Sequence, residues 1–101
     1  MGANQFINKK SAKTAVEAFR ALVEEARCDS GHSGYTGTIA EKDDFRMVSA
    51  GATPTLEFVE QCFDDSNHWC QDKWGPAACV DAGVARTSGH RIYVFFGFAS
   101  S

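Results

Sequence analysis

The fold of this chain is best predicted from the apolar segment RIYVFFGFA, residues Arg91 to Ala99. Successive side chains of a strand point to opposite faces of its sheet. Here one face carries Ile92, Val94, Phe96 and Phe98, and the other carries Tyr93, Phe95 and Gly97. Both faces are apolar, so each of them needs a cover that keeps it away from water.

Upstream of this strand, a long amphipathic helix is predicted from Ser11 to a stop between Asp29 and Gly31. Its apolar residues recur at steps of three and four, which is the spacing of one helix face. They are Ala12, Val16, Phe19, Leu22, Val23 and Ala26. Ser11, or Thr14 together with Glu17, is expected to bind the free amides at the start of this helix.

A second helix is predicted from Thr53 to about Asp65. Thr53 is the expected cap, and Pro54 suits the first helical position because no amide hydrogen is needed there. The apolar face of this helix consists of Leu56, Val59, Cys62 and Phe63. We expect both helices to pack on the same face of the sheet through Phe19, Val23, Val59 and Phe63.

Further strands are predicted at Ala3–Ile7, Thr36–Lys42, Phe45–Ser49 and Ala78–Ala82. A hairpin is expected between the second and third of these, a short helical turn over Asn67–Gly75, and an antiparallel pair for the last two strands of the chain. The predicted fold class is therefore α+β. It has two layers, with an antiparallel or mixed sheet of four to five strands and two main helices on one face.

Two helices on one face would leave the other face of the sheet open. One expected cover is the Asn67–Pro76 segment, with Trp69 or Trp74 folded over Phe95. The alternative cover is a second copy of the chain. Because closed twofold assemblies are the commonest, this alternative predicts a homodimer.

Composition predicts one domain and argues against several classes of function. Residues 1–101 have the length of a single domain and carry a net charge of −3. Nonspecific nucleic-acid binding, which depends on positive charge, is therefore not expected. The longest apolar stretch, Ile92–Ala99, is less than half of the roughly 20 residues that a spanning helix needs. No export signal is visible, so the expected location is the cytoplasm.

The four cysteines, Cys28, Cys62, Cys70 and Cys79, form no C-x-x-C pair, and reduced thiols are expected. Together with His68, the last three offer soft metal ligands within one region of the sequence. Their spacing matches no common zinc module. We therefore predict no metal site, and no cofactor is implied.

The most unusual local feature is the glycine-rich segment GHSGYTGT, residues 31–38. Its side chains suited to a polar ligand are those of His32, Ser33, Tyr35, Thr36 and Thr38. The segment follows a helix and does not precede one, so it is neither a P-loop nor a dinucleotide fingerprint. An anion would be held by loop amides, Lys42 or a protonated His32. The alternative is that the glycines only form turns and Tyr35 packs.

Two polar clusters complete the predicted ligand site. One is Glu41 with Lys42, and the other is Asp72 with Lys73 and Trp74. The Trp74 ring can stack on a base while Lys73 or Asp72 binds phosphate or hydroxyl groups. The alternative for these clusters is solvated ion pairs and a structural tryptophan.

An enzyme would use His32 as a general base beside Ser33 or Tyr35, with Glu41 as a second titrating group. The sequence contains neither a nucleophile elbow nor a matched pair of carboxylates. We therefore predict no catalytic residues.

Four strings resemble small bacteriophage and prophage proteins of unknown function. They are GHSGYTGTIAEK (31–42), DKWGPAACV (72–80), YVFFGFASS (93–101) and the opening MGANQF. The resemblance covers most of the chain and implies a phage context, with the host cytoplasm as location, but it carries over no activity. By analogy, an acidic phage domain of this size without an enzyme motif is often an inhibitor or a sequestering protein aimed at host defence.

The leading prediction is a noncatalytic binding protein that captures a small polar molecule, with nucleotide derivatives as the candidate class, and so counters host defence. One alternative is an inhibitor that docks on a host defence protein. Another is a small enzyme that acts on a nucleotide-like ligand. Unchanged ligand, a complex with a host protein, and turnover are the observations that distinguish these three functions.

Overall fold

A computed structural model describes residues 3–30, 39, 42–49, 53–65, 75–84 and 89–100. In this part of the chain, four strands and two helices follow one another as β1 (Ala3–Ala12), α1 (Ala15–Ser30), β2 (Phe45–Val48), α2 (Thr55–Asp64), β3 (Ala77–Val84) and β4 (Arg91–Ser100). The predicted α+β class, with one sheet and two helices, is confirmed.

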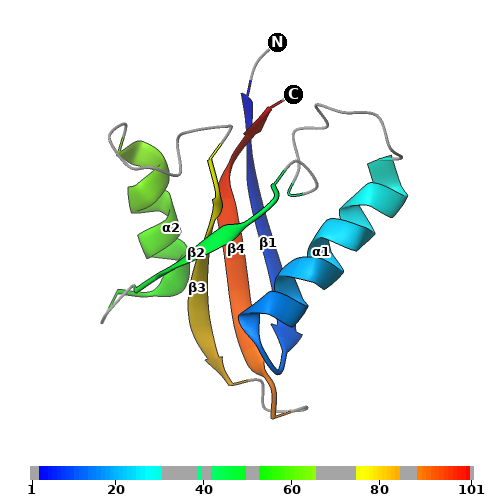
Figure 1. Ribbon diagram of the computed structural model, residues 1–101. Coiled ribbons are helices and arrows are strands. Elements are labelled where there is room, and N and C mark those ends of the chain that lie inside the picture. Colours follow the sequence, from blue (N-terminus) through cyan, green and yellow to red (C-terminus); the bar gives the residue numbers. More distant parts are fainter. Residues whose placement is uncertain are drawn as a thin grey trace.

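The four strands form one mixed sheet in the order β1-β4-β3-β2 (Figure 1). The central strand β4 is antiparallel to both neighbours, β1 and β3, while β2 is parallel to β3. The apolar segment 91–99, which belongs to β4, therefore has a strand on either side as well as two apolar faces. The predicted antiparallel pairing of the last two strands is confirmed.

The two helices lie on opposite faces of this sheet, and the prediction that both cover one face is wrong (Figure 1). Tyr93 and Phe95 of β4 share an apolar cluster with Phe19 and Val23 of α1. Their neighbours Val94 and Phe96 point the other way and share a second cluster with Val59 of α2, against which Phe63 packs. We refer to these two sides as the α1 face and the α2 face.

The direction of the strand connections explains this placement. The connection through α1 leads from β1 across β4 and β3 to the far edge of the sheet, whereas the connection through α2 returns from β2 to β3. Crossovers between parallel strands are almost always right-handed. Right-handed crossovers that run in opposite directions across a sheet place their helices on opposite faces.

The start of α1 also differs from the prediction. Strand β1 pairs with β4 without interruption as far as Ala12, so Ser11 and Ala12 belong to the strand. Thr14 then provides the helix cap, because its Oγ1 accepts a hydrogen bond from the Glu17 amide at 3.2 Å. In α2, Pro54 is itself the cap residue, and no side chain binds the first amides.

The predicted hairpin before α2 is not found in the described residues. Strand β2 pairs in parallel with β3, from Phe45 opposite Ala77 to Val48 opposite Val80. Ile39 lies in a 3₁₀ turn and Lys42 lies outside the strands, while most of the predicted Thr36–Lys42 strand is outside the described residues. The predicted Asn67–Gly75 turn also lies outside them, except for Gly75, which is in a bend.

Aromatic rings from three elements form the centre of the α1 face. The rings of Phe19, Phe45 and Phe95 contact one another, with centroid separations of 5.1 to 5.6 Å. Such tilted and edge-on arrangements are the favoured ones for aromatic pairs. Ile39 is fully buried in the same cluster, so the segment before β2 also closes this face.

The α2 face is closed by edge-to-face contacts of a shorter helix. The Phe58 and Phe63 rings stand edge-on to Phe96, and Phe63 also contacts Phe98 at 5.7 Å. Because α2 covers this second face and Phe95 is fully buried under α1, the open face from which a homodimer was predicted does not exist. The homodimer itself stays a prediction that needs another surface.

Candidate functional site

Of the predicted site residues, the described part of the chain contains Lys42. This lysine is 2% exposed, and its Nζ donates a hydrogen bond to the carbonyl oxygen of Gly75 at 2.8 Å. The ammonium also lies 5.9 Å from the centre of the Phe6 ring, within the range of a cation–π interaction. Lys42 thus joins the segment before β2 to the start of β3 and to β1.

A second contact strengthens the same junction. The Ala77 amide donates a hydrogen bond to the Asp44 carbonyl oxygen at 3.0 Å, just before Phe45 begins the parallel pairing with β3. The backbone of residues 42–44 is therefore held against the beginning of β3. This arrangement fixes one wall of the groove described next.

A groove of about 550 Å³ lies between α1 and residues 42–43. Phe19 and Val23 form its apolar floor, and each is buried except for a small part of its surface. The remaining lining residues are Arg20, Glu24, Arg27, Cys28, Lys42 and Asp43. The groove thus combines an apolar floor with a charged rim, which is the usual composition of a small-molecule site.

The charges on this rim are not neutralised by one another. Arg20, Glu24 and Arg27 are exposed, and none of the three takes part in an ion pair within the described residues. Arg20 and Arg27 are two helical turns apart, with Glu24 between them on the same side of α1. Two guanidinium groups and one carboxylate are therefore available to a ligand.

The other predicted site residues lie outside the described residues. They are His32, Ser33, Tyr35, Thr36, Thr38, Glu41, Asp72, Lys73 and Trp74. Their convergence with Lys42 on one pocket stays a prediction.

A second hollow, of about 310 Å³, lies where the pairing of β2 with β3 ends and α2 begins. Its lining residues are Val48, Ser49, Thr53, Thr55, Val80, Asp81 and Ala82. Ligands of open sheets with parallel strands commonly bind at such strand ends. The hollow has three hydroxyl groups, but Asp81 places a carboxylate in its wall, which disfavours an anion.

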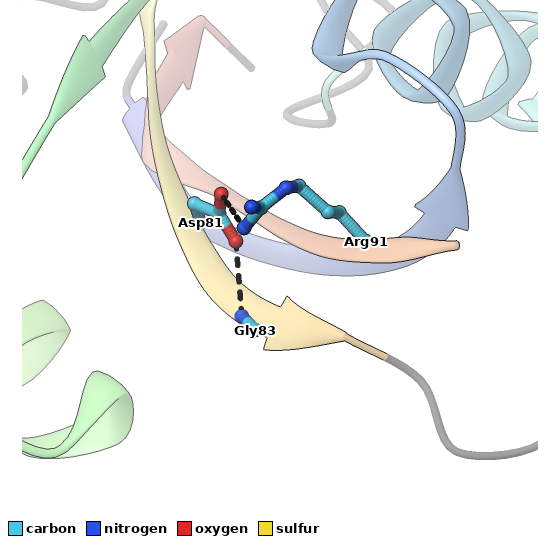
Figure 2. A network of polar contacts seen from close by, with 3 residues as sticks. All are labelled: Asp81, Gly83 and Arg91. Atoms are coloured by element: carbon cyan, nitrogen blue, oxygen red, sulfur yellow. Dashed lines mark hydrogen bonds and ion pairs between the residues drawn. The ribbon is translucent and has the colours of Figure 1, made fainter. Parts of the chain in front are cut away.

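Figure 2 shows that this carboxylate contacts residues of both β3 and β4. Asp81 accepts a hydrogen bond from the Gly83 amide at 3.0 Å and forms a 2.8 Å ion pair with Arg91. The pairing of β3 with β4 shifts register between Asp81 and Val84, and Gly83 has a positive φ of 108°. Because glycine adopts such a φ without a steric penalty, Asp81 and Gly83 together form the bulge.

The described cysteines do not converge on a metal site. Cys79 belongs to the α1 face and Cys62 to the α2 face, so the sheet separates them. Within the described residues no group of three or more His, Cys, Asp or Glu side chains is placed to hold a metal ion. Burial, and secondarily the Asp81 carboxylate, raises the pKa of Cys79 to about 12. Burial, with Asp65 as a lesser cause, also raises the pKa of Cys62.

No family model, no curated protein and no solved structure matches this chain. Among the described residues, no helix is long and apolar enough to cross a membrane.

Sequence reasoning missed the contribution of α1 to the groove. The alternation of Arg20, Glu24 and Arg27 is typical of a solvated helix face, and nothing local distinguishes it from one. The local sequence of α1 does not show that Lys42 and Asp43 lie beside this helix and form a groove with it. That position depends on contacts with Gly75 and Ala77, more than thirty residues later in the chain.

Proposed function

We propose that this protein is a noncatalytic binding protein that captures a small nucleotide-like molecule in the groove beside α1. The observation that carries this proposal is the pair of unpaired guanidinium groups, Arg20 and Arg27, above the apolar floor of Phe19 and Val23. Guanidinium groups bind phosphate oxygens through paired hydrogen bonds, which favours a phosphate-bearing ligand.

The rest of the groove supports a nucleotide over a simple anion. An apolar floor suits the flat face of a base, and the carboxylate of Glu24 can accept hydrogen bonds from ribose hydroxyls. A free phosphate would use only the cationic part of this rim. A nucleoside monophosphate uses the floor, the carboxylate and both guanidinium groups together.

The cationic residues of the groove support binding over acid–base catalysis. Arginine keeps its proton throughout the physiological range and does not act as a general acid or base. The ammonium of Lys42 is occupied by the Gly75 carbonyl oxygen and by the Phe6 ring. We therefore assign Arg20 and Arg27 to binding, and Lys42 to holding the groove wall.

The proposed biological role follows from the phage resemblance of residues 31–42 and 72–80. A phage protein that sequesters a nucleotide-derived signal in the host cytoplasm would lower the concentration of that signal and so counter host defence. Capture requires roughly one protein for each ligand molecule, whereas an enzyme would be needed only in catalytic amounts.

Calorimetric titration with adenosine monophosphate tests the proposal, with adenosine and inorganic phosphate as separate probes. We expect the monophosphate to bind more tightly than either fragment. Arg20→Gln and Arg27→Gln should each weaken its binding about tenfold, because each removes a charged hydrogen-bond donor.

The matched control is Lys13→Gln, which removes one positive charge from an exposed position outside the groove. Equal weakening by Lys13→Gln would mean that the effect is general electrostatics and that the groove is not the site. Absence of binding to all three probes would remove the proposed ligand class. Mass spectrometry of the recovered monophosphate completes the test, because a changed molecule would show an enzyme.

A further inference from the structure

The outer edge of strand β1 carries an inference that is independent of the groove. All ten residues of β1, Ala3–Ala12, pair with β4 on one side, without a register shift. The described residues place no strand on the other side, since β1 is the first strand of the sheet order. Alternate residues of such an edge direct their backbone amides and carbonyls outward, ready to pair with another strand.

Monomeric proteins usually protect an edge strand by making it short, by interrupting it with proline or a bulge, or by placing charges along it. Strand β1 is long, has no proline and is not bulged. Its only charged residues, Lys9 and Lys10, are close to one end. In its middle, Ile7 is 48% exposed although its neighbour on β4, Phe96, is fully buried.

We propose that β1 pairs with β1 of a second copy in antiparallel orientation, with Ile7 opposite Ile7 on a twofold axis. The two sheets then join into one continuous sheet of eight strands, four from each copy. The interface is isologous, as closed dimers require, because each copy presents the same strand to the other.

The distribution of charge along β1 favours antiparallel pairing centred away from the two lysines. With Ile7 on the axis, Lys9 stands opposite Gln5 of the second copy, and Lys10 stands opposite Asn4. Each lysine therefore meets a neutral amide side chain, and no lysine faces another. Parallel pairing in register would place both lysines beside their own copies, and like charges directly opposite are destabilising.

The position of α1 is compatible with this pairing. Lys10 forms a 2.6 Å ion pair with Glu25, so α1 lies above β1 on the α1 face. The twofold axis keeps both copies of α1 on the same side of the joined sheet. Ala21, a small residue, lies one turn before Glu25 on the same flank of α1.

Light scattering at micromolar concentration is the first test. The purified protein should have twice the chain mass of 11.0 kDa. Ile7→Lys should return the mass to 11.0 kDa while leaving the chain folded, because it places two ammonium groups opposite each other at an exposed position. Leu56→Lys is the matched control, since Leu56 is 69% exposed and belongs to α2, not to the β1 edge.

Disulfide trapping tests the register directly in a background with Cys28 and Cys70 replaced by Ser. Directly opposed residues of an antiparallel pair are close enough for a disulfide after slight adjustment. Ile7→Cys should form a covalent dimer with itself. Gln5→Cys should form one only when mixed with Lys9→Cys.

Either measurement can overturn the proposal. A mass of 11.0 kDa for the unsubstituted protein throughout the range would exclude the dimer. A dimer that survives Ile7→Lys, or that cross-links equally through Leu56→Cys and Ile7→Cys, would show that the interface lies elsewhere.

Discussion

The α1 face and the α2 face of the sheet are closed in different ways. On the α1 face, a helix of 16 residues with a side-chain cap covers a cluster of three mutually contacting rings. On the α2 face, a helix of 10 residues without a side-chain cap rests on edge-to-face contacts to Phe96. Residues Ile39 and Lys42 add to the α1 face only.

This difference indicates that the two layers contribute unequally to stability. Regions with few buried apolar contacts open locally at lower free energy than the core does. We therefore expect α2 to be the less stable layer. The packing of the α1 face should determine most of the free energy of global unfolding.

The largest effect is expected at Phe95. Phe95→Ala removes a fully buried ring that contacts both Phe19 and Phe45. It should lower the free energy of unfolding by about 3 to 5 kcal/mol, measured by urea denaturation. Phe63→Ala, which removes a partly buried ring from the α2 face, should cost about 1 to 2 kcal/mol. Equal losses at the two positions would contradict the proposed inequality.

A smaller effect is expected from the buried ammonium of Lys42. Lys42→Met keeps most of the apolar side chain but leaves the Gly75 carbonyl oxygen without its donor and removes the contact with the Phe6 ring. The free energy of unfolding should fall by about 1 to 3 kcal/mol. The matched substitution Lys13→Met, at an exposed lysine, should be nearly neutral. If the two variants are equally stable, the junction at Lys42 does not stabilise the α1 face.

The helix caps provide a finer comparison. Thr14→Ala removes the oxygen that accepts from the Glu17 amide and should destabilise the protein by about 1 kcal/mol. Thr14→Ser keeps this oxygen and should retain most of the stability. In α2, Pro54→Ser introduces a cap where none exists and should raise stability by up to about 1 kcal/mol. If Thr14→Ala leaves the free energy of unfolding unchanged, the side-chain cap does not make α1 more stable than α2.

The smallest expected effect is a pH dependence of stability that comes from Cys79 on the α1 face and is absent at neutral pH. Its folded pKa of about 12 lies above the ordinary value of 9.0, so the folded state retains the thiol proton more strongly than the unfolded state does. The stabilisation is complete below pH 9.0 and is lost as the pH rises towards about 12. Urea denaturation above and below pH 9.0 should show a steeper decline for the parent protein than for Cys79→Ala. Identical pH dependence of the two would place the thiol in contact with water.

Much of the local structure was predictable because the information is contained in short stretches. The three-and-four spacing of Phe19, Leu22 and Val23 indicated α1, and the cap at Thr14 was among the two that were expected. The site was less predictable. Lys42 was chosen for its charge, but its contacts with Gly75 and Phe6 give it a position in the core. The charged groove residues of α1, Arg20, Glu24 and Arg27, were not predicted as site residues.

Residues 91–99 were predictable as a strand with two apolar faces, and two amphipathic helices were predictable as its covers, because these properties depend on residues close together in the chain. The parallel pairing of β2 with β3, the placement of the helices on opposite faces and the contact of residues 42–43 with α1 were not predictable and became known from the three-dimensional structure. These features depend on which distant strands become neighbours and on the direction in which each connection crosses the sheet. The local sequence pattern is the same for either direction of crossing, so it does not predict which direction the connection takes.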